Sequence, residues 1–225
     1  AVYGPTRVIT SKLLKEFKIK THFYNPESIK NLQSKINKRT RMIFVENPGS
    51  NTFEFQDLSK IIKIAKKRKI VTAIDNTWGT PFFIKPLKIG FDMSISSGTK
   101  YLSGHSDVML GSLAVNKKIY EKVKFCNKLF GYRASPDDAY LVLRGLRTLD
   151  VRLKKHEEST KKIVSFLKKE KKINEILYPH KKGSENYENW KKYYSGSTGL
   201  FSVIIKSKNR NSIYKFINSL KLFGI

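Results

Sequence analysis

Cysteine is nearly absent from this sequence, since Cys126 is the only one in 225 residues. A single thiol excludes an intrachain disulfide and suits a reducing compartment, so we expect a cytoplasmic protein. The sequence also lacks any run of about 18 apolar residues, so no membrane-spanning helix is expected. Its first residues, Ala1 to Arg7, carry neither a signal-peptide pattern nor an initiating methionine, and we expect a fragment of a longer protein.

Several binding motifs are missing as well. No Gly-x-Gly-x-x-Gly or Walker-type loop occurs, so nothing in the sequence supports a dinucleotide or nucleoside triphosphate site. The four histidines are scattered, and none stands at metal-ligand spacing, so no metal centre is expected. Internal repeats and low-complexity linkers are absent too, which leaves a globular chain long enough for a sizeable core.

Acidic residues are few, because the chain has 18 Asp and Glu against 45 Lys and Arg, a formal net charge of +27. Strong positive charge raises the expectation of binding to nucleic acid or an acidic membrane. The lysines, however, are spread along the whole chain in short clusters such as Lys66 to Lys69. We interpret most of the charge as solvated surface and expect neither nucleic acid nor a membrane as partner. A basic nucleic-acid-binding module remains the alternative from a different functional class.

Short apolar runs alternate with segments whose apolar residues recur every three or four positions. This alternation predicts an α/β fold with a mostly parallel sheet covered by helices. The expected strands are residues 20–24, 42–45, 70–74, 93–95 and 110–115, and the expected helices are residues 7–15, 26–36, 58–68 and 117–129. Asp57 is the expected N-cap of the third of these helices.

A long helical pattern begins at Pro136 and continues to Leu167. Gly145 interrupts it, and we expect a kink or close packing there. Beyond this stretch, residues 173–178 and 199–205 are predicted strands, and residues 212–220 a predicted helix. The expected organisation is a large domain over residues 1–146 and part of a smaller α+β domain over residues 147–225.

Two polar side chains follow neighbouring strands of the predicted sheet. Asp75 comes directly after the apolar run Ile70 to Ile74, and Lys100 follows Met93 to Ile95 after a short hydroxyl-rich stretch. Ligands of open parallel sheets bind at the carboxyl ends of the strands. We therefore expect Asp75 and Lys100 to face one ligand.

An acid, a lysine and small hydroxyls together suit pyridoxal phosphate. This cofactor needs a lysine amine for its aldehyde carbon, an acid beside its pyridinium nitrogen and donors for its phosphate. Lys100 and Asp75 are candidates for the first two roles, and Ser97 and Thr99 for the third. Taken singly, an aspartate after a strand is commonly a turn residue and a lysine is commonly solvated. Their combination and order favour the cofactor.

These residues belong to longer motifs: Ile74-Asp75-Asn76-Thr77-Trp78, Ser97-Gly98-Thr99-Lys100-Tyr101-Leu102 and Gly104-His105-Ser106-Asp107. They resemble the pyridoxal-phosphate-dependent enzymes of cysteine and methionine metabolism, and the resemblance covers all 225 residues. Leu-Arg-Gly-Leu-Arg-Thr-Leu, ending at Leu149, is shared with the same family, and Trp190 to Ser202 is similar to its bacterial beta-lyase branch. The resemblance implies an aspartate-aminotransferase-like architecture, fold type I, and a homotetramer.

The resemblance also implies roles for single residues. Lys100 is expected to hold the cofactor and, once freed, to remove the α proton of the substrate. Asp75 is expected to keep the ring nitrogen protonated. Tyr3 matches a tyrosine that stacks on the ring near the leaving group, and Thr77 belongs to the cofactor-binding motif.

Asn51 closes the segment that begins at Glu46. This segment resembles a Glu-x-Pro-x-Asn pattern of the family, but it has one extra residue between the proline and the asparagine. We expect Asn51 to contact the substrate, and an ordinary turn asparagine is the open alternative.

The implied reaction is β-elimination at the carbon–sulfur bond of the amino acid cystathionine, which yields homocysteine, pyruvate and ammonia. Sister enzymes that carry out γ-elimination or γ-replacement share the cofactor residues, as does methionine gamma-lyase, so these activities remain alternatives. An inactive scaffold subunit is a third interpretation.

The resemblance further implies that groups of the complete enzyme lie outside this sequence. Family members carry a preceding segment with a Gly-Met pair for the cofactor phosphate, and a Tyr and an Arg that reach the phosphate of a neighbouring subunit. The arginine for the substrate carboxylate follows the matched region. We therefore expect the 225-residue chain alone to bind cofactor weakly and to show little activity.

Overall fold

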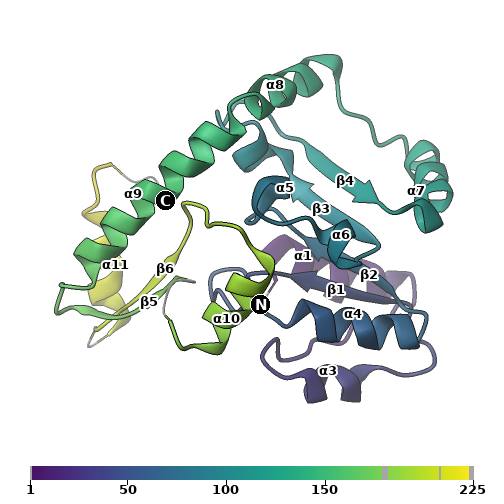
Figure 1. The fold of residues 1–225 in the computed structure, drawn as a ribbon, viewed down its shortest axis with the longest axis horizontal. Coiled ribbons are helices and arrows are strands. Elements are labelled where there is room, and N and C mark those ends of the chain that lie inside the picture. Colours follow the sequence, from purple (N-terminus) through teal and green to yellow (C-terminus); the bar gives the residue numbers. More distant parts are fainter. Residues whose placement is uncertain (1, 179–181, 208, 223–225) are drawn as a thin grey trace.

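The chain forms two sheets in a computed structural model that describes residues 2–178, 182–207 and 209–222 (Figure 1). The larger sheet has the order β1-β2-β3-β4, and the smaller one pairs β5 with β6. The first four strands are Met42–Glu46 (β1), Val71–Asp75 (β2), Met93–Ser97 (β3) and Gly111–Val115 (β4). The strands β1, β2 and β3 run parallel, and β4 is antiparallel to β3. The predicted α/β class with a mostly parallel sheet is confirmed.

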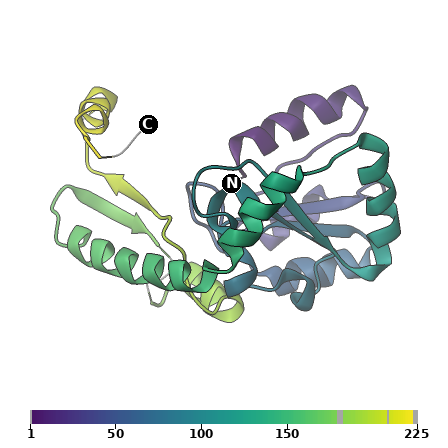
Figure 2. The same cartoon turned by 90° about the horizontal axis from the view of Figure 1, so that it is seen from above.

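Helices lie on both faces of the larger sheet (Figure 2). One face carries the N-terminal helical segment, which consists of Gly4–Val8 (α1), a π-helical turn Ile9–Leu13 (η1) and Leu14–Glu16 (α2). The other face carries Leu58–Lys67 (α4). The remaining helices around this sheet are Ile29–Lys35 (α3), Thr80–Phe83 (α5), Pro86–Ile89 (α6) and Lys117–Phe130 (α7).

The sequence of α4 explains why it packs on the sheet. The Asp57 side chain accepts a hydrogen bond from the backbone N–H of Lys60 at 3.2 Å and caps the helix, as predicted. Its buried face is the predicted one and consists of Leu58, Ile61, Ile62 and Ala65. Each large apolar side chain buried in this way stabilises the fold by roughly 1.5–3 kcal/mol.

The predicted strand at residues 20–24 is wrong. Within the described ranges β1 pairs with β2 alone, so no neighbour hydrogen-bonds this segment as a strand. Its aromatic side chains make other contacts: the Arg7 guanidinium lies 4.3 Å from the ring centroid of Phe23, and the Tyr24 hydroxyl donates to Oε1 of Gln56 at 2.6 Å. A strand-like residue pattern does not supply the partner that a strand requires.

The predicted long helical stretch consists of two helices, Pro136–Leu146 (α8) and Leu149–Leu167 (α9). Gly145 lies against the backbone carbonyls of Leu102 and Ser103 so closely that a Cβ atom would clash with them. The expected close packing at this glycine is therefore confirmed.

The long helix α9 leads away from the larger sheet to the smaller one, formed by Ile173–Leu177 (β5) and Ser202–Ile205 (β6), and to Arg210–Asn218 (α11) (Figure 1). A further helix, Glu185–Tyr193 (α10), was not predicted. It lies beside α4 of the larger sheet, where the Tyr193 hydroxyl donates to Oδ1 of Asp57 at 2.7 Å. The division into domains at residues 146 and 147 stays a prediction.

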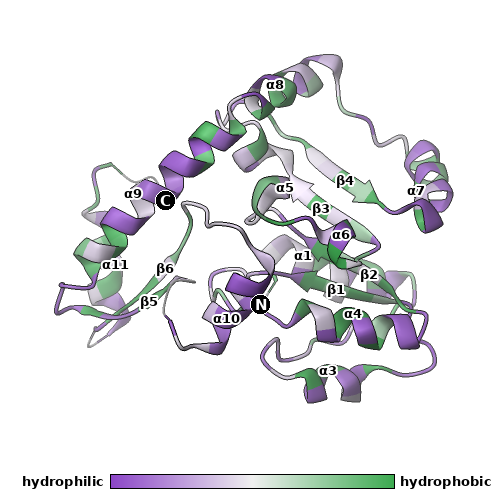
Figure 3. Ribbon diagram, viewed as in Figure 1, coloured by the Kyte–Doolittle hydropathy of each residue, from purple (hydrophilic) through white to green (hydrophobic). Residues whose placement is uncertain are grey.

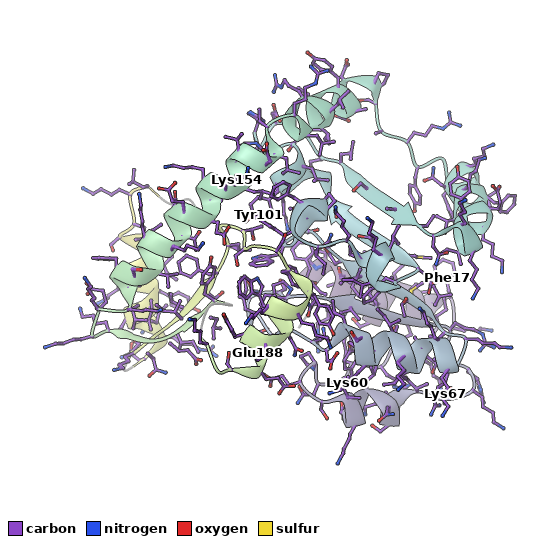
Figure 4. The ribbon with its side chains drawn as sticks, viewed as in Figure 1. Phe17, Lys60, Lys67, Tyr101, Lys154 and Glu188 are labelled. Carbon is purple, nitrogen blue, oxygen red and sulfur yellow. The ribbon has the colours of Figure 1, made fainter. Side chains whose placement is uncertain are left out.

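Apolar residues concentrate in β1 and β2, and the helices combine polar and apolar residues (Figure 3). The lysines lie mainly on the polar faces: Lys60 of α4 and Lys154 of α9 have side chains 66% and 69% exposed, and Figure 4 shows where they emerge. This arrangement agrees with solvated positive charge. Among the described helices, none is long and apolar enough to cross a membrane.

Candidate active site

Two carboxylates stand side by side where the parallel strands end. Glu46 closes β1, Asp75 closes β2, and the strand register pairs them; Asp75 is in turn paired with Ile95 of β3. Oδ1 of Asp75 accepts a hydrogen bond from the backbone N–H of Thr77 at 2.9 Å. No described residue donates to the other oxygen, Oδ2, which leaves one half of this carboxylate available to a ligand.

Thr77 ties the ends of β2 and β3 together. Its Oγ1 accepts a hydrogen bond from the backbone N–H of Ser97 at 2.9 Å. The hydroxyl of Ser97 itself has no hydrogen-bond partner within the described part of the chain. Thr77 thus fixes the backbone around the site, whereas Ser97 presents a donor for a ligand.

Lys100 lies in the turn that follows β3, the π-helical segment Gly98–Leu102 (η2). The backbone N–H groups of Gly98 and Thr99 both donate to the carbonyl oxygen of Leu110, at 2.6 and 3.2 Å, and Oγ1 of Thr99 accepts from the Leu110 N–H at 3.0 Å. The hydroxyl of Thr99 is therefore engaged in holding the turn. Lys100 is exposed and has non-helical backbone angles, φ −93° and ψ −114°.

The residue after Lys100 points toward α9. The Tyr101 ring meets the His156 ring edge-on at a centroid distance of 5.7 Å, and its label in Figure 4 lies beside α9. Burial raises the pKa of the Tyr101 hydroxyl. Neighbouring side chains of this turn thus serve different purposes, because Tyr101 packs inward while Lys100 stays accessible.

Tyr3 brings the N-terminal segment to the same place. The Nζ atom of Lys100 lies 4.9 Å from the centroid of the Tyr3 ring, within the range of a cation–π contact. The backbone N–H of Tyr3 donates to Oε2 of Glu46 at 2.6 Å. Tyr3 thus links the turn of Lys100 to the end of β1, and the expected roles of Tyr3 and Lys100 toward the cofactor stay predictions.

The pKa of Glu46 is raised to about 7. Burial is the largest cause and the neighbouring Asp75 carboxylate adds to it, while the N–H of Tyr3 and the amine of Lys100 act in the opposite direction. Two acids at adjacent strand ends repel each other when both are ionised. Glu46 therefore takes up a proton near neutral pH.

A cavity of about 650 Å³ lies on the α8–α9 side of the turn, and Thr99 and Lys100 line it together with Arg152 and His156. Asp75, Tyr3, Thr77 and Ser97 are not part of its lining. Asn51 is exposed in the loop after β1 with a φ of +65°, a conformation common for turn asparagines. Its expected contact with substrate stays a prediction.

The residues present fit pyridoxal phosphate. Lys100 supplies an accessible amine, Asp75 a free carboxylate oxygen, Ser97 a free hydroxyl and Tyr3 a ring beside the amine. These are the groups that the aldehyde, ring nitrogen, phosphate and ring face of the cofactor require.

The profile of the family described as Cys/Met metabolism PLP-dependent enzyme matches residues 1–225. The chain belongs to this family. Pyridoxal phosphate is therefore its cofactor, as the sequence predicted.

Two relatives illustrate the range of the family. The cystathionine beta-lyase of Escherichia coli is 34% identical over 226 residues, which cover 99% of this chain and 57% of that protein. An L-alanine/L-glutamate racemase of Wolbachia pipientis is 36% identical over 204 residues, covering 90% of this chain and 50% of that protein.

A solved structure, the cystathionine gamma-lyase of Lactobacillus plantarum complexed with L-serine, superposes with a TM-score of 0.94 at 26% identity. The match covers 100% of this chain and 58% of that one, so this chain spans little more than half the length of its relatives.

Sequence reasoning missed Glu46 as a member of the site. In the sequence, Glu46 stands out only as the start of the segment that ends at Asn51. Its position at the end of a strand could have indicated it. Glu46 closes its apolar strand as Asp75 closes the next one, and parallel strands end at the same edge of a sheet.

Proposed function

We propose that this chain is the cofactor-binding part of a carbon–sulfur lyase that cleaves L-cystathionine by β-elimination. The observation that carries the proposal is the exposed Lys100 amine, which lies 4.9 Å from the Tyr3 ring at the strand ends that present Asp75. The Escherichia coli relative that bears the name cystathionine beta-lyase supports the choice of substrate.

The chain's own residues have separate tasks in this reaction. When bound, pyridoxal phosphate supplies an electron sink for the pair left at the substrate α carbon. Lys100 would hold the cofactor through its amine, and the freed Nζ would remove the α proton of the substrate. The carboxylate of Asp75 would stabilise the protonated form of the ring nitrogen. Tyr3 covers the site beside the amine. The overall reaction converts cystathionine and water into homocysteine, pyruvate and ammonia.

The product 2-oxo acid distinguishes this proposal from its relatives' reactions. β-Cleavage of cystathionine gives pyruvate, whereas γ-cleavage gives 2-oxobutyrate and cysteine. A racemase such as the Wolbachia relative would interconvert alanine enantiomers and release neither acid from cystathionine. The experiment incubates the complete lyase, of which this chain is the proposed cofactor-binding part, and its Lys100→Ala variant with cystathionine and pyridoxal phosphate. Pyruvate from the wild type alone supports the proposal, and 2-oxobutyrate as the main product overturns it.

Assembly with further copies of the chain, as a homotetramer, is part of the proposal. The N-terminal helical segment has no buried residue and exposes Val8, Ile9 and Leu13. Apolar surface of this kind is expected at subunit contacts. Sedimentation analysis of the purified protein measures the state directly: a mass four times that of the chain supports the tetramer, and a monomer at all concentrations contradicts it.

A further inference from the structure

Arg152 of α9 joins segments that are far apart in the sequence. Its guanidinium donates to the backbone carbonyls of Gly145 at 2.8 Å, Tyr101 at 2.9 Å and Leu102 at 3.5 Å, and to the hydroxyl of Thr148 at 3.1 Å. A planar guanidinium has five N–H groups in fixed directions, so it can bridge such a set of acceptors, which a lysine amine cannot do in the same geometry.

These carbonyls lie at the ends of helical segments. Gly145 is in the last turn of α8, and Tyr101 and Leu102 close η2. The last carbonyls of a helix lack partners within it, and a positive charge is favourable there. One side chain therefore caps both segments and holds them against each other. Gly145 completes the contact, because its missing side chain lets α8 approach the carbonyl of Ser103.

The turn that carries Lys100 is fixed at two points. Leu110 holds its beginning through the N–H groups of Gly98 and Thr99. Arg152 holds its end, one and two residues after Lys100. Between these points the backbone departs from helical geometry at Lys100 itself. The direction of the Lys100 side chain therefore depends on both fixed points.

We infer that Arg152 is a positioning residue for Lys100: by bridging Tyr101, Leu102 and Gly145 it fixes the direction in which the Lys100 amine enters the site. Arg152 and Lys100 also line the same cavity on the α8–α9 side of the turn. The inference rests on the proposed role of Lys100 as the residue that holds the cofactor. It assigns Arg152 no contact with the cofactor.

The test is the rate at which pyridoxal phosphate is attached to Lys100. The purified protein is mixed with the cofactor, quenched with borohydride at successive times and digested, and mass spectrometry quantifies the labelled Lys100 peptide. Circular dichroism gives the folded fraction, so that rate constants are expressed per folded molecule. A purely structural role of Arg152 would lower the folded fraction and leave that rate constant unchanged.

Three variants separate charge from bridging. Arg152→Met removes the donors, Arg152→Lys keeps the charge without the bridge, and Lys154→Met removes a charge from an exposed position of the same helix. We expect the rate constant at Lys100 to fall by about tenfold to a hundredfold in both Arg152 variants, the effect of a small misplacement of a reacting group. The Lys154 variant should match the wild type. A wild-type rate in Arg152→Lys or Arg152→Met overturns the inference.

Gly145→Ala pushes α8 away from the carbonyls of Leu102 and Ser103, while the Arg152 side chain is unchanged. We expect a loss of rate comparable to that of Arg152→Met, and this variant decides the question if the Arg152 variants do not fold. An unchanged rate in Gly145→Ala contradicts the inference. Failure of the wild type to become labelled at Lys100 is a different result, because it overturns the proposed function and with it the role of Arg152.

Discussion

Oγ1 of Thr77 accepts a hydrogen bond from the backbone N–H of Ser97 at 2.9 Å. This single bond joins the loop after β2, which carries Asp75, to the end of β3, which leads to Lys100. The separation between the acid and the amine is therefore set by the backbone of two neighbouring strands and by a side chain that bridges them. A rigid frame of this kind is what a pre-organised site requires.

Thr77→Val tests this bridge, because it keeps the shape of the side chain and removes the acceptor. The Ser97 N–H then lacks its partner, which costs about 1–3 kcal/mol of unfolding free energy in a partly buried position. Urea unfolding measures this loss, with Thr77→Ser as the control that restores the hydroxyl. A Thr77→Val variant as stable as the wild type would show that the bridge contributes nothing.

Asp75→Asn separates the proposed catalytic role of the acid from its local structural one. Asparagine retains an oxygen that can accept the Thr77 N–H, so the fold should be unchanged. It cannot stabilise a protonated ring nitrogen, so we expect pyruvate release from cystathionine to fall by more than about tenfold, or 1.4 kcal/mol of activation free energy. Rates that differ by less than this would remove Asp75 from its proposed role.

Glu46→Gln should change how stability depends on pH. The folded-state pKa of Glu46 is about 7, above the ordinary value of 4.5, so the folded protein favours the protonated acid. The stability that this protonation contributes is fully present below pH 4.5 and is lost as the pH rises through about 7. Glutamine stays neutral and avoids this loss.

The measurement is the difference in unfolding free energy between Glu46→Gln and the wild type across this pH range. The difference should move in favour of the variant as the pH rises. Glu121→Gln, an exposed change on α7, corrects for the general effect of removing a negative charge. A difference that moves in favour of the wild type would contradict the raised pKa.

Local pattern was sufficient to predict much of the fold. The run Met42 to Val45 and the spaced apolar positions of α4 each specify their element through burial of one face, and both formed as expected. Residues 20–24 have an equally suitable pattern but lack a hydrogen-bonded neighbour, which no local pattern reveals. The helix α10 was missed because its buried face is small, with Asn189 as its buried residue.

The residues of the site likewise differ in whether local sequence predicts them. Asp75 and Lys100 were found because each follows a recognisable strand, and the family motifs surround them. Arg152 gave no such signal, since its partners Tyr101 and Leu102 are about 50 residues away and are backbone carbonyls. Contacts between a side chain and remote backbone leave no mark in residue type. They become visible only when the packing of η2 against α8 is known.

Borohydride reduction with pyridoxal phosphate, followed by peptide mapping, tests the central claim most directly. The chain contains 36 lysines, so many amines compete for the cofactor. The account predicts one dominant label, on the peptide that contains Lys100, and loss of that label in a folded Lys100→Ala variant without transfer to another lysine. A dominant label on any other lysine, or stable attachment that persists in Lys100→Ala, would contradict it.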